Sequence, residues 1–124
     1  MRVRTRVFFV EQGVPESLEV DGRDPQCIHV AAFCADRILG TGRLLPDGRI
    51  GRMAVLAESR SRGIGGRMLE TLVDAARARG DAQVRLAAQV GAIPFYSRHG
   101  FVARGDKFIE AGILHQEMVR GLGD

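Results

Sequence analysis

The sequence predicts an α+β fold in which a mostly antiparallel sheet packs against one long amphipathic helix. Apolar residues recur every three or four positions between Met68 and Ala76, which is typical of a helix with one buried face, and Gly80 is expected to end it. Short apolar runs separated by turn residues such as Pro46-Asp47-Gly48 predict strands. The expected strands, about six in all, are 27–35, 37–45, 49–55, 83–89, 101–109 and 114–120.

Periodicity does not decide the secondary structure of the first 26 residues. Val3, Val7 and Val10 fit one face of a helix, whereas residues 2–7 alternate like a strand. The following segment, 13–26, combines glycine and proline with carboxylates and predicts a loop with a helical turn near Pro15–Leu18. Its acidity indicates either a solvated surface or attraction of a cationic substrate.

Length and composition indicate one domain, spanning residues 1–124. The net charge of +3 comes from scattered basic residues, so we expect no nucleic-acid partner. We see no signal peptide and no apolar run long enough to cross a membrane, and we expect a cytoplasmic protein with no membrane partner. Cys27 and Cys34 are too few for a disulfide framework, and the spacing of cysteines and histidines predicts no metal site.

A glycine-rich turn, RSRGIGG at residues 60–66, separates the strand at 49–55 from the long helix. Glycine lets backbone N–H groups approach a ligand closely, and the start of a helix favours an anion. The turn therefore predicts a phosphate cradle, with a simple chain reversal as the alternative. It fits neither the dinucleotide fingerprint, which would require glycine at Met68, nor the Walker loop, because Arg67 and Met68 follow Gly66.

A second motif, IPFYSRHGF, spans residues 93–101. Pro94 and Gly100 predict a short helix between them, and Phe95 and Phe101 are expected in the core. Tyr96 is the chain's single tyrosine. It is either a half-buried structural residue or a phenol available for chemistry.

Arg60, Gly63 and Gly65 match the pattern R-x-x-G-x-G, which resembles the pyrophosphate motif of the GNAT superfamily of acetyl-CoA-dependent N-acetyltransferases. Nearly the whole chain is similar to the ElaA-like or YjcF-like branch of that superfamily. The stretches that carry this similarity, in order, are 3–15, 19–32, 40–55, 60–80, 88–102 and 110–118.

This resemblance implies that the opening segment is the first helix and that the strands at 50–55 and 84–89 splay apart around the pantetheine arm of acetyl-CoA. It implies that Tyr96 protonates the departing thiolate and that the N–H of Val55 stabilises the oxyanion. The cofactor-binding residues that it implies are Met53, Ala54, Val55, Arg60, Ser61, Arg62, Gly63, Ile64, Gly65, Gly66 and Gln89. No metal is expected.

Two features depart from the family pattern. The strand that normally precedes the first helix is missing. Either the start of the chain is truncated, or the sheet has one strand fewer and an exposed edge at 27–35, which would weaken the acceptor site or favour a homodimer. The strand at 50–55 carries no carboxylate, so no general base is assigned. The candidates are Glu11, Asp21, His29, His115 or a chain of water molecules, with structural roles as the alternative: a surface cap for Glu11, a backbone-bonded strand residue for His29 and an edge residue for His115.

The sequence thus predicts transfer of an acetyl group from acetyl-CoA, as co-substrate, to the primary amine of a small molecule. The acidic segment 11–24 favours a cationic acceptor. The alternative is a catalytically weak acyl-CoA-binding sensor or regulatory domain. A nucleotide-binding module of another fold would require the two splayed strands to be absent.

Overall fold

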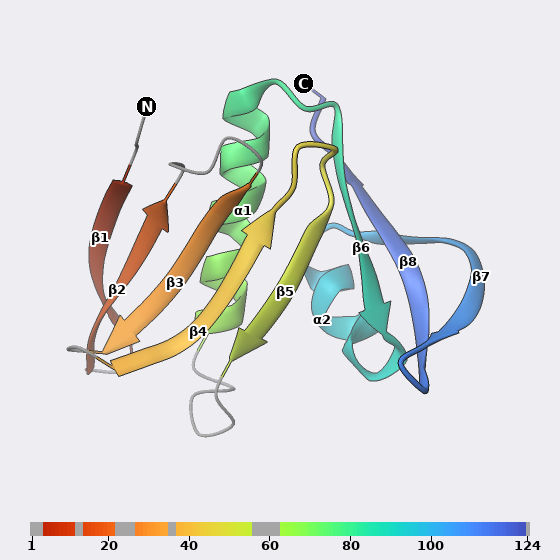
Figure 1. The fold of residues 1–124 in the computed structure, drawn as a ribbon, viewed down its shortest axis with the longest axis horizontal. Helices are drawn as coiled ribbons and strands as arrows, with labels where there is room; N and C mark the ends of the chain where they lie inside the picture. The colour runs from red at the N-terminus through yellow and green to blue at the C-terminus, as the bar shows by residue number, and fades with distance from the viewer. Residues whose placement is uncertain (1–3, 12–13, 22–26, 35–36, 56–62, 124) are drawn as a thin grey trace.

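A computed structural model describes residues 4–11, 14–21, 27–34, 37–55 and 63–123 (Figure 1). Its first sheet has five antiparallel strands in sequence order, so each strand forms a hairpin with the next. These strands are β1 (Arg4–Glu11), β2 (Val14–Asp21), β3 (Ile28–Cys34), β4 (Arg37–Leu44) and β5 (Ile50–Val55). The turn between β4 and β5 is closed by a 3.1 Å hydrogen bond from Gly48 N–H to the carbonyl of Leu45, as the proline-glycine signal predicts.

The second sheet has three strands in the order β6-β8-β7, so β8 lies in the middle. Its members are β6 (Gln83–Gln89), β7 (Val102–Glu110) and β8 (Ile113–Gly121). Within the described ranges, β5 and β6 meet at one parallel bridge between Arg49 and Arg85, and Arg85 N–H donates to the Gly48 carbonyl at 3.0 Å. Beyond this bridge the two strands diverge (Figure 1). The predicted α+β class, mostly antiparallel pairing and central splay are therefore confirmed.

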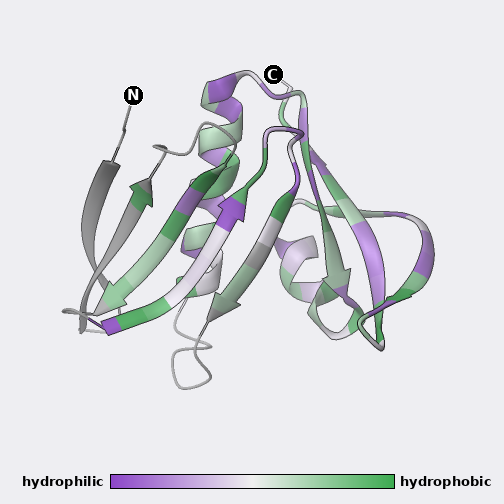
Figure 2. Ribbon diagram, viewed as in Figure 1, coloured by the Kyte–Doolittle hydropathy of each residue, from purple (hydrophilic) through white to green (hydrophobic). Residues whose placement is uncertain are grey.

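The long helix α1 (Ile64–Arg79) lies across one face of the five-stranded sheet (Figure 1). Its apolar residues form the centre of the core, because the side chains at helical spacing are almost completely buried. These are Ile64, Met68, Leu69, Leu72, Val73 and Ala76. Figure 2 shows hydrophobic segments, in green, on α1, β3 and β4. Gly80 ends the helix in the left-handed conformation, with φ of 91°, as predicted.

The prediction that the opening segment is a helix is wrong. Residues 4–11 and 14–21 form a hairpin whose eight-pair register runs from Arg4 opposite Asp21 to Glu11 opposite Val14. Valine, threonine and phenylalanine crowd a helical turn but fit an extended chain, which is the preference that the alternation at residues 2–7 had indicated. The predicted loop with a helical turn at Pro15–Leu18 is likewise replaced by β2.

The predicted exposed edge at 27–35 is also wrong, because β2 pairs with β3 from Ser17 opposite Phe33 to Asp21 opposite His29. The hairpin therefore supplies two strands beyond the six expected. The remaining elements follow the prediction closely, including the short helix α2 (Ile93–Arg98), which a 3₁₀ turn, η2 (Val90–Ala92), precedes. No helix among the described residues is long and apolar enough to span a membrane.

Candidate functional site

The divergence of β5 and β6 opens a cleft of about 1320 Å³. One wall is β5, with Met53 and Ala54, and the other is β6, with Ala87 and Gln89. The helix side of the cleft is formed by the first turns of α1 and by α2, which carries Tyr96. Segments far apart in the sequence are thus brought together, because a hydrogen bond joins β6 to the residues just before β5 and the two strands then separate.

The glycine-rich turn enters this cleft where α1 begins. The helix starts at Ile64, one residue after Gly63, so Gly65 and Gly66 belong to its first turn instead of preceding it as expected. Gly63 is the N-cap, with φ of 79°, a conformation that strains other residues. Among the described residues no side chain caps the helix, and its first turn has no acidic residue, so N–H groups there are available to an anion.

The predicted ligands Arg60, Ser61 and Arg62 lie outside the described residues. Gly63, Gly65 and Gly66 line the cleft, as do Met53, Ala54 and Gln89. The side chain of Ile64 is instead buried in the core, at 1% exposure, so a contribution to a ligand would come from its backbone. The backbone of Val55 pairs with Gly40 at the end of β5, and its side chain is outside the description.

The polar face of α1 reaches the cleft through residues that the sequence analysis did not select. Arg67, Glu70, Thr71 and Asp74 all line it. Their spacing of three and four residues places them on one helical face, opposite the apolar one, and this polar periodicity was the available signal. Asp74 also pairs with Arg77 at 2.9 Å, one turn along the helix.

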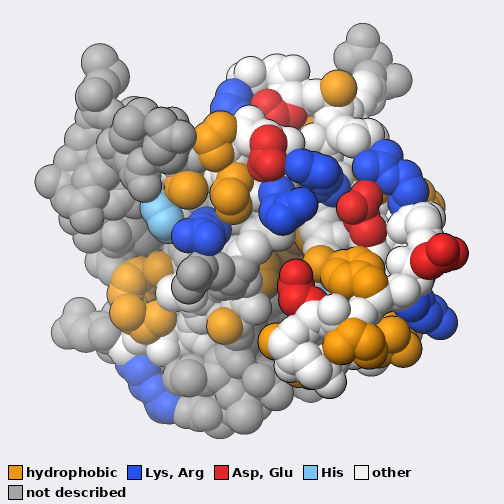
Figure 3. All heavy atoms as spheres, turned by 45° about the vertical axis from the view of Figure 1, so that its right-hand side comes forward, with side chains coloured by type: hydrophobic (Ala, Val, Ile, Leu, Met, Phe, Trp, Pro, Cys, Tyr) orange, Lys and Arg blue, Asp and Glu red, His pale blue; other side chains and the backbone are white. Residues whose placement is uncertain are grey.

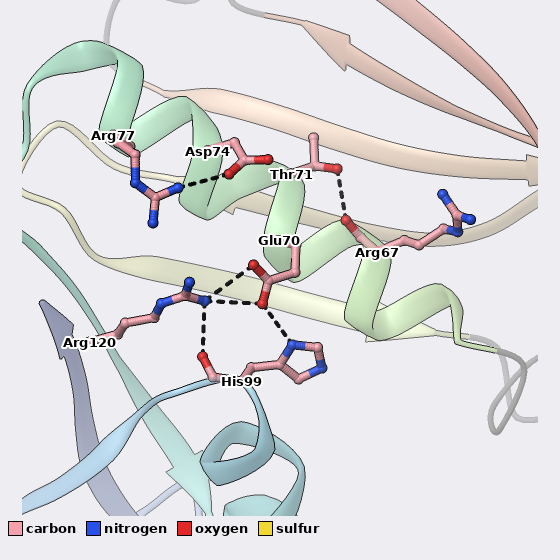
Figure 4. A network of polar contacts seen from close by, with 7 residues as sticks. All are labelled: Arg67, Glu70, Thr71, Asp74, Arg77, His99 and Arg120. Carbon is pink, nitrogen blue, oxygen red and sulfur yellow. Dashed lines mark hydrogen bonds and ion pairs between the residues drawn. The ribbon is translucent and has the colours of Figure 1, made fainter. Parts of the chain in front are cut away.

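Glu70 is the centre of a polar network that joins α1 to the second sheet (Figure 4). His99 Nδ1 lies 2.7 Å from Glu70 Oε2, and Arg120 Nη1 donates to both carboxylate oxygens at 3.2 and 3.0 Å. Arg120 also donates to the His99 carbonyl at 2.9 Å. Burial opposes ionisation of Glu70, but the His99 hydrogen bond and the charge of Arg120 outweigh it, so its pKa lies below the usual value.

His99 is fixed directly against the start of α1. A Cβ atom added to Gly66 would lie 3.0 Å from His99 Nε2 and 3.1 Å from Cε1. Gly66 does not have a positive φ, so the close approach of the imidazole, rather than backbone geometry, is the reason for glycine at this position. The network thus holds the end of α2 against the glycine turn, and His99 itself lines the cleft.

Tyr96 is half-buried among aromatic rings. Its ring makes edge contacts with Phe95, at a centroid distance of 5.0 Å, and with Phe101, at 5.9 Å. Phe101 is buried in the core and Phe95 packs partly against it, in agreement with the prediction. Burial raises the pKa of the Tyr96 phenol, so at neutral pH the hydroxyl keeps its proton and can donate it.

The base candidates separate by position. The side chains of Glu11 and Asp21 are outside the description, and His29 is exposed on β3, away from the cleft lining. His115 lines the cleft and is only 7% exposed. Its assignment as an edge residue is wrong, since β8 lies between β6 and β7.

Positive and negative side chains are intermixed on the described part of one face. On the face shown in Figure 3, the coloured arginine and carboxylate side chains alternate, and no continuous basic patch forms among them. Arg85 of β6, for example, pairs with Asp47 at 3.0 Å, and Arg104 of β7 pairs with Glu117 at 3.0 Å.

Comparison with known proteins establishes the class as an acetyltransferase: the sequence profile of the acetyltransferase (GNAT) domain matches residues 2–122. The chain therefore belongs to the GNAT family of acetyltransferases. It is 36% identical over 122 residues to the uncharacterized N-acetyltransferase YjcF of Bacillus subtilis, covering 95% of this chain and 87% of that protein. It is 34% identical to a UPF0039 protein of Mycobacterium tuberculosis, covering 97% of this chain and 81% of the relative.

Solved structures give the same class. An acyl-CoA N-acyltransferase from Pseudomonas aeruginosa superposes with a TM-score of 0.69 at 31% identity, covering 77% of this chain and 68% of that one. Escherichia coli ElaA superposes with a TM-score of 0.68 at 25% identity, covering 76% and 68% of the two chains. The resemblance drawn from the six sequence stretches is thereby confirmed.

Proposed function

We propose that this chain transfers an acetyl group from acetyl-CoA to the primary amine of a small molecule. The observation that carries the proposal is the cleft between β5 and β6, which brings the uncapped start of α1 and the Tyr96 phenol into one cavity. One end of that cavity suits a diphosphate and the other suits a departing thiolate.

The cleft fits acetyl-CoA in size and in polarity. Its volume of about 1320 Å³ is sufficient for a large cofactor, and its glycine-lined end presents N–H groups without a competing acidic side chain in the first helical turn. Two structural neighbours with the same fold support this choice, because one is described as complexed with coenzyme A and the other as having acetyl-CoA bound. Both are 18% identical, so they support the fold and suggest the ligand.

The proposed roles follow from position. Backbone groups of Met53 and Val55 on the open side of β5 bind the pantetheine arm as an added strand would, with Ala54 and Gln89 beside it. Amides of residues 60–66 bind the pyrophosphate. Holding the thioester and the amine together supplies much of the rate, and Tyr96 donates its proton to the thiolate.

The acceptor is assigned by charge. Residues 11–24 contain Glu11, Glu16, Glu19, Asp21 and Asp24, and a cationic small molecule is the acceptor that this acidity favours. A cytoplasmic location accords with the proposal, because Cys27 is a free thiol.

The direct test is thiol release from acetyl-CoA by the purified protein in the presence of a panel of cationic primary amines, with acetylated product identified by mass spectrometry. Amine-dependent release that Tyr96→Phe slows would support the proposal. Tight binding of acetyl-CoA with no release for any amine would contradict it and would favour the acyl-CoA-binding sensor.

A further inference from the structure

His115 is a titratable residue of the cleft that takes no part in the Glu70 network. It lies on β8, directly opposite Gln89 of β6 in the strand register. Its side chain is 7% exposed, yet it contributes to the cleft lining. A buried imidazole that opens onto a reaction cleft is a candidate for proton transfer.

The hydrogen bonds of the ring define which nitrogen carries the proton. His115 Nδ1 lies 2.7 Å from the carbonyl oxygen of Ile113, and a carbonyl can only accept, so Nδ1 must be the donor. In the neutral ring the lone pair is then on Nε2. The Phe108 ring stacks on the imidazole at 5.8 Å and 18°, which restrains its orientation.

Nε2 remains free to accept a proton. No hydrogen bond or ion pair among the described residues engages His115 Nε2. It is also not a buried atom left without a partner, because among the described side chains that atom is Arg43 Nε. His115 lines the cleft, and Nε2 is the ring nitrogen that is left available for a reaction there.

His115 and Tyr96 approach the splay from opposite sides. In an antiparallel pair, residues opposite each other project from the same face. Leu86 and Met118 form one such pair and are buried in the core beside the helices, so His115 and Gln89 project from the other face. Tyr96 reaches the cleft from α2, on the helix side.

We propose that His115 Nε2 is the general base of the reaction, an inference that rests on the proposed function. It accepts a proton from the acceptor ammonium, whose nitrogen then forms a bond to the acetyl carbon as the carbon–sulfur bond breaks. The sulfur takes its proton from the Tyr96 hydroxyl. The acetylated nitrogen must still lose its second proton, and the phenolate takes up that proton. The imidazolium releases its own proton to solvent, so charge and atoms balance over a turnover.

The surroundings of His115 allow the imidazolium to form. Protonation at Nε2 leaves the Nδ1 bond to the Ile113 carbonyl intact. Glu117 and Arg104 pair with each other, as do Arg85 and Asp47, so these groups add little net charge. The charged residues at same-face register positions on the three strands are Arg85, Arg104, Glu110 and Glu117.

The test compares two acceptors of similar size in wild type and His115→Asn. Ethylamine is protonated at neutral pH and needs a base, whereas 2,2,2-trifluoroethylamine is largely unprotonated because its fluorines withdraw electrons. Asparagine places an amide nitrogen where Nδ1 lies and so keeps the donor to Ile113, but it has no Nε2. His29→Asn, which replaces the competing histidine, is the matched control.

We expect His115→Asn to lower kcat/KM for ethylamine by about 10²–10³-fold, a typical effect of losing a general base, and to change the rate with trifluoroethylamine less than about tenfold. Equal losses with both amines, or a loss in His29→Asn instead, would overturn the inference, because a structural role would not discriminate by acceptor pKa. If the enzyme accepts neither amine, thiol release with water as the acceptor provides the rate. There His115→Asn should lower the rate as much as with ethylamine.

Titration with acetyl-CoA separates this inference from the proposed function. If wild type binds no acetyl-CoA, the proposed function fails and the base assignment fails with it. If wild type and His115→Asn bind acetyl-CoA equally and release thiol at equal rates, the base assignment alone is overturned. If wild type binds acetyl-CoA but releases no thiol with any of the three acceptors, the proposed transfer fails and the base assignment fails with it.

Discussion

Replacing Gly66 by alanine tests how closely the glycine turn depends on its neighbour. Gly66 has no positive φ and belongs to the first turn of α1, so an alanine there meets no backbone strain. Its Cβ would lie 3.0 Å from His99 Nε2 and 3.1 Å from Cε1, which is closer than ordinary van der Waals contact. The imidazole must move by a few tenths of an ångström.

The imidazole cannot move freely, because its Nδ1 is held 2.7 Å from Glu70, which Arg120 holds in turn. Complete loss of a hydrogen bond to a charged group costs about 1.5–3 kcal/mol, and weakening the bond costs part of that amount. Alanine in place of glycine in a helix gains about 0.5–1 kcal/mol. We therefore expect Gly66→Ala to destabilise the wild type by about 1 kcal/mol and to stabilise the His99→Ala variant by about 0.5–1 kcal/mol, because the obstacle is gone.

Urea unfolding, followed by circular dichroism, of the four proteins of this double-mutant cycle measures the difference. The expected coupling free energy is about 2 kcal/mol. In thermal unfolding, each kcal/mol would shift the melting temperature by roughly 3–6 °C for a chain of this size. A Gly66→Ala change that stabilises both backgrounds equally would refute the reasoning, since the contact with His99 would then have no energetic weight.

Three other predictions concern the site and the core. Tyr96→Phe should slow thiol release by about 10–100-fold while leaving the calorimetric affinity for acetyl-CoA within about threefold, and a large loss of affinity would contradict its role as proton donor. Because the pKa of Glu70 is lowered from its ordinary 4.5, its ion pairs stabilise the fold above that pH and are lost as pH falls through the lowered value. Glu70→Gln should therefore cost about 1 kcal/mol in urea unfolding at pH 7 and progressively less as the pH falls below 4.5, and a loss that does not change with pH would contradict the ion-pair account. Leu72→Ala, at a fully buried position of α1, should cost about 2–5 kcal/mol in the same assay, and a loss under about 1 kcal/mol would mean that α1 does not form the core.

The sequence was sufficient for those elements whose local pattern and tertiary environment agree. The helix that ends at Gly80 has a clear apolar periodicity, and the strands from 83 onward alternate or run apolar between turn residues. Pro94 and Gly100 delimited α2 closely for the same reason, because proline and glycine restrict the backbone strongly.

The opening segment was mispredicted because two periodicities overlap there. Val3, Val7 and Val10 satisfied a helical spacing, and the family resemblance decided for a helix, whereas β1 pairs with β2 along its whole length. A strand is stabilised by pairing with its neighbour. The neighbour of β1 is β2, which contains proline and carboxylates and did not look like a strand on its own.

The site could be located from the sequence but not completed. The glycine turn and Tyr96 were visible as motifs, but the network of Glu70, His99 and Arg120 joins three elements separated by as many as 50 residues. The sequence named His115 as one of four base candidates. Its place in the cleft lining, the register opposite Gln89 and the hydrogen bond to Ile113 distinguish it, and all three depend on the tertiary structure.

The central claim, that the cleft between β5 and β6 binds acetyl-CoA, is tested most directly by isothermal titration of acetyl-CoA, 3′-dephospho-CoA and NAD. The account predicts acetyl-CoA binding on the order of micromolar. It also predicts a large loss in Gly63→Val, at the left-handed N-cap, and none in Gly121→Val, where a new Cβ meets open space. A folded wild type that gives no heat with acetyl-CoA, or that binds NAD equally well, would contradict it.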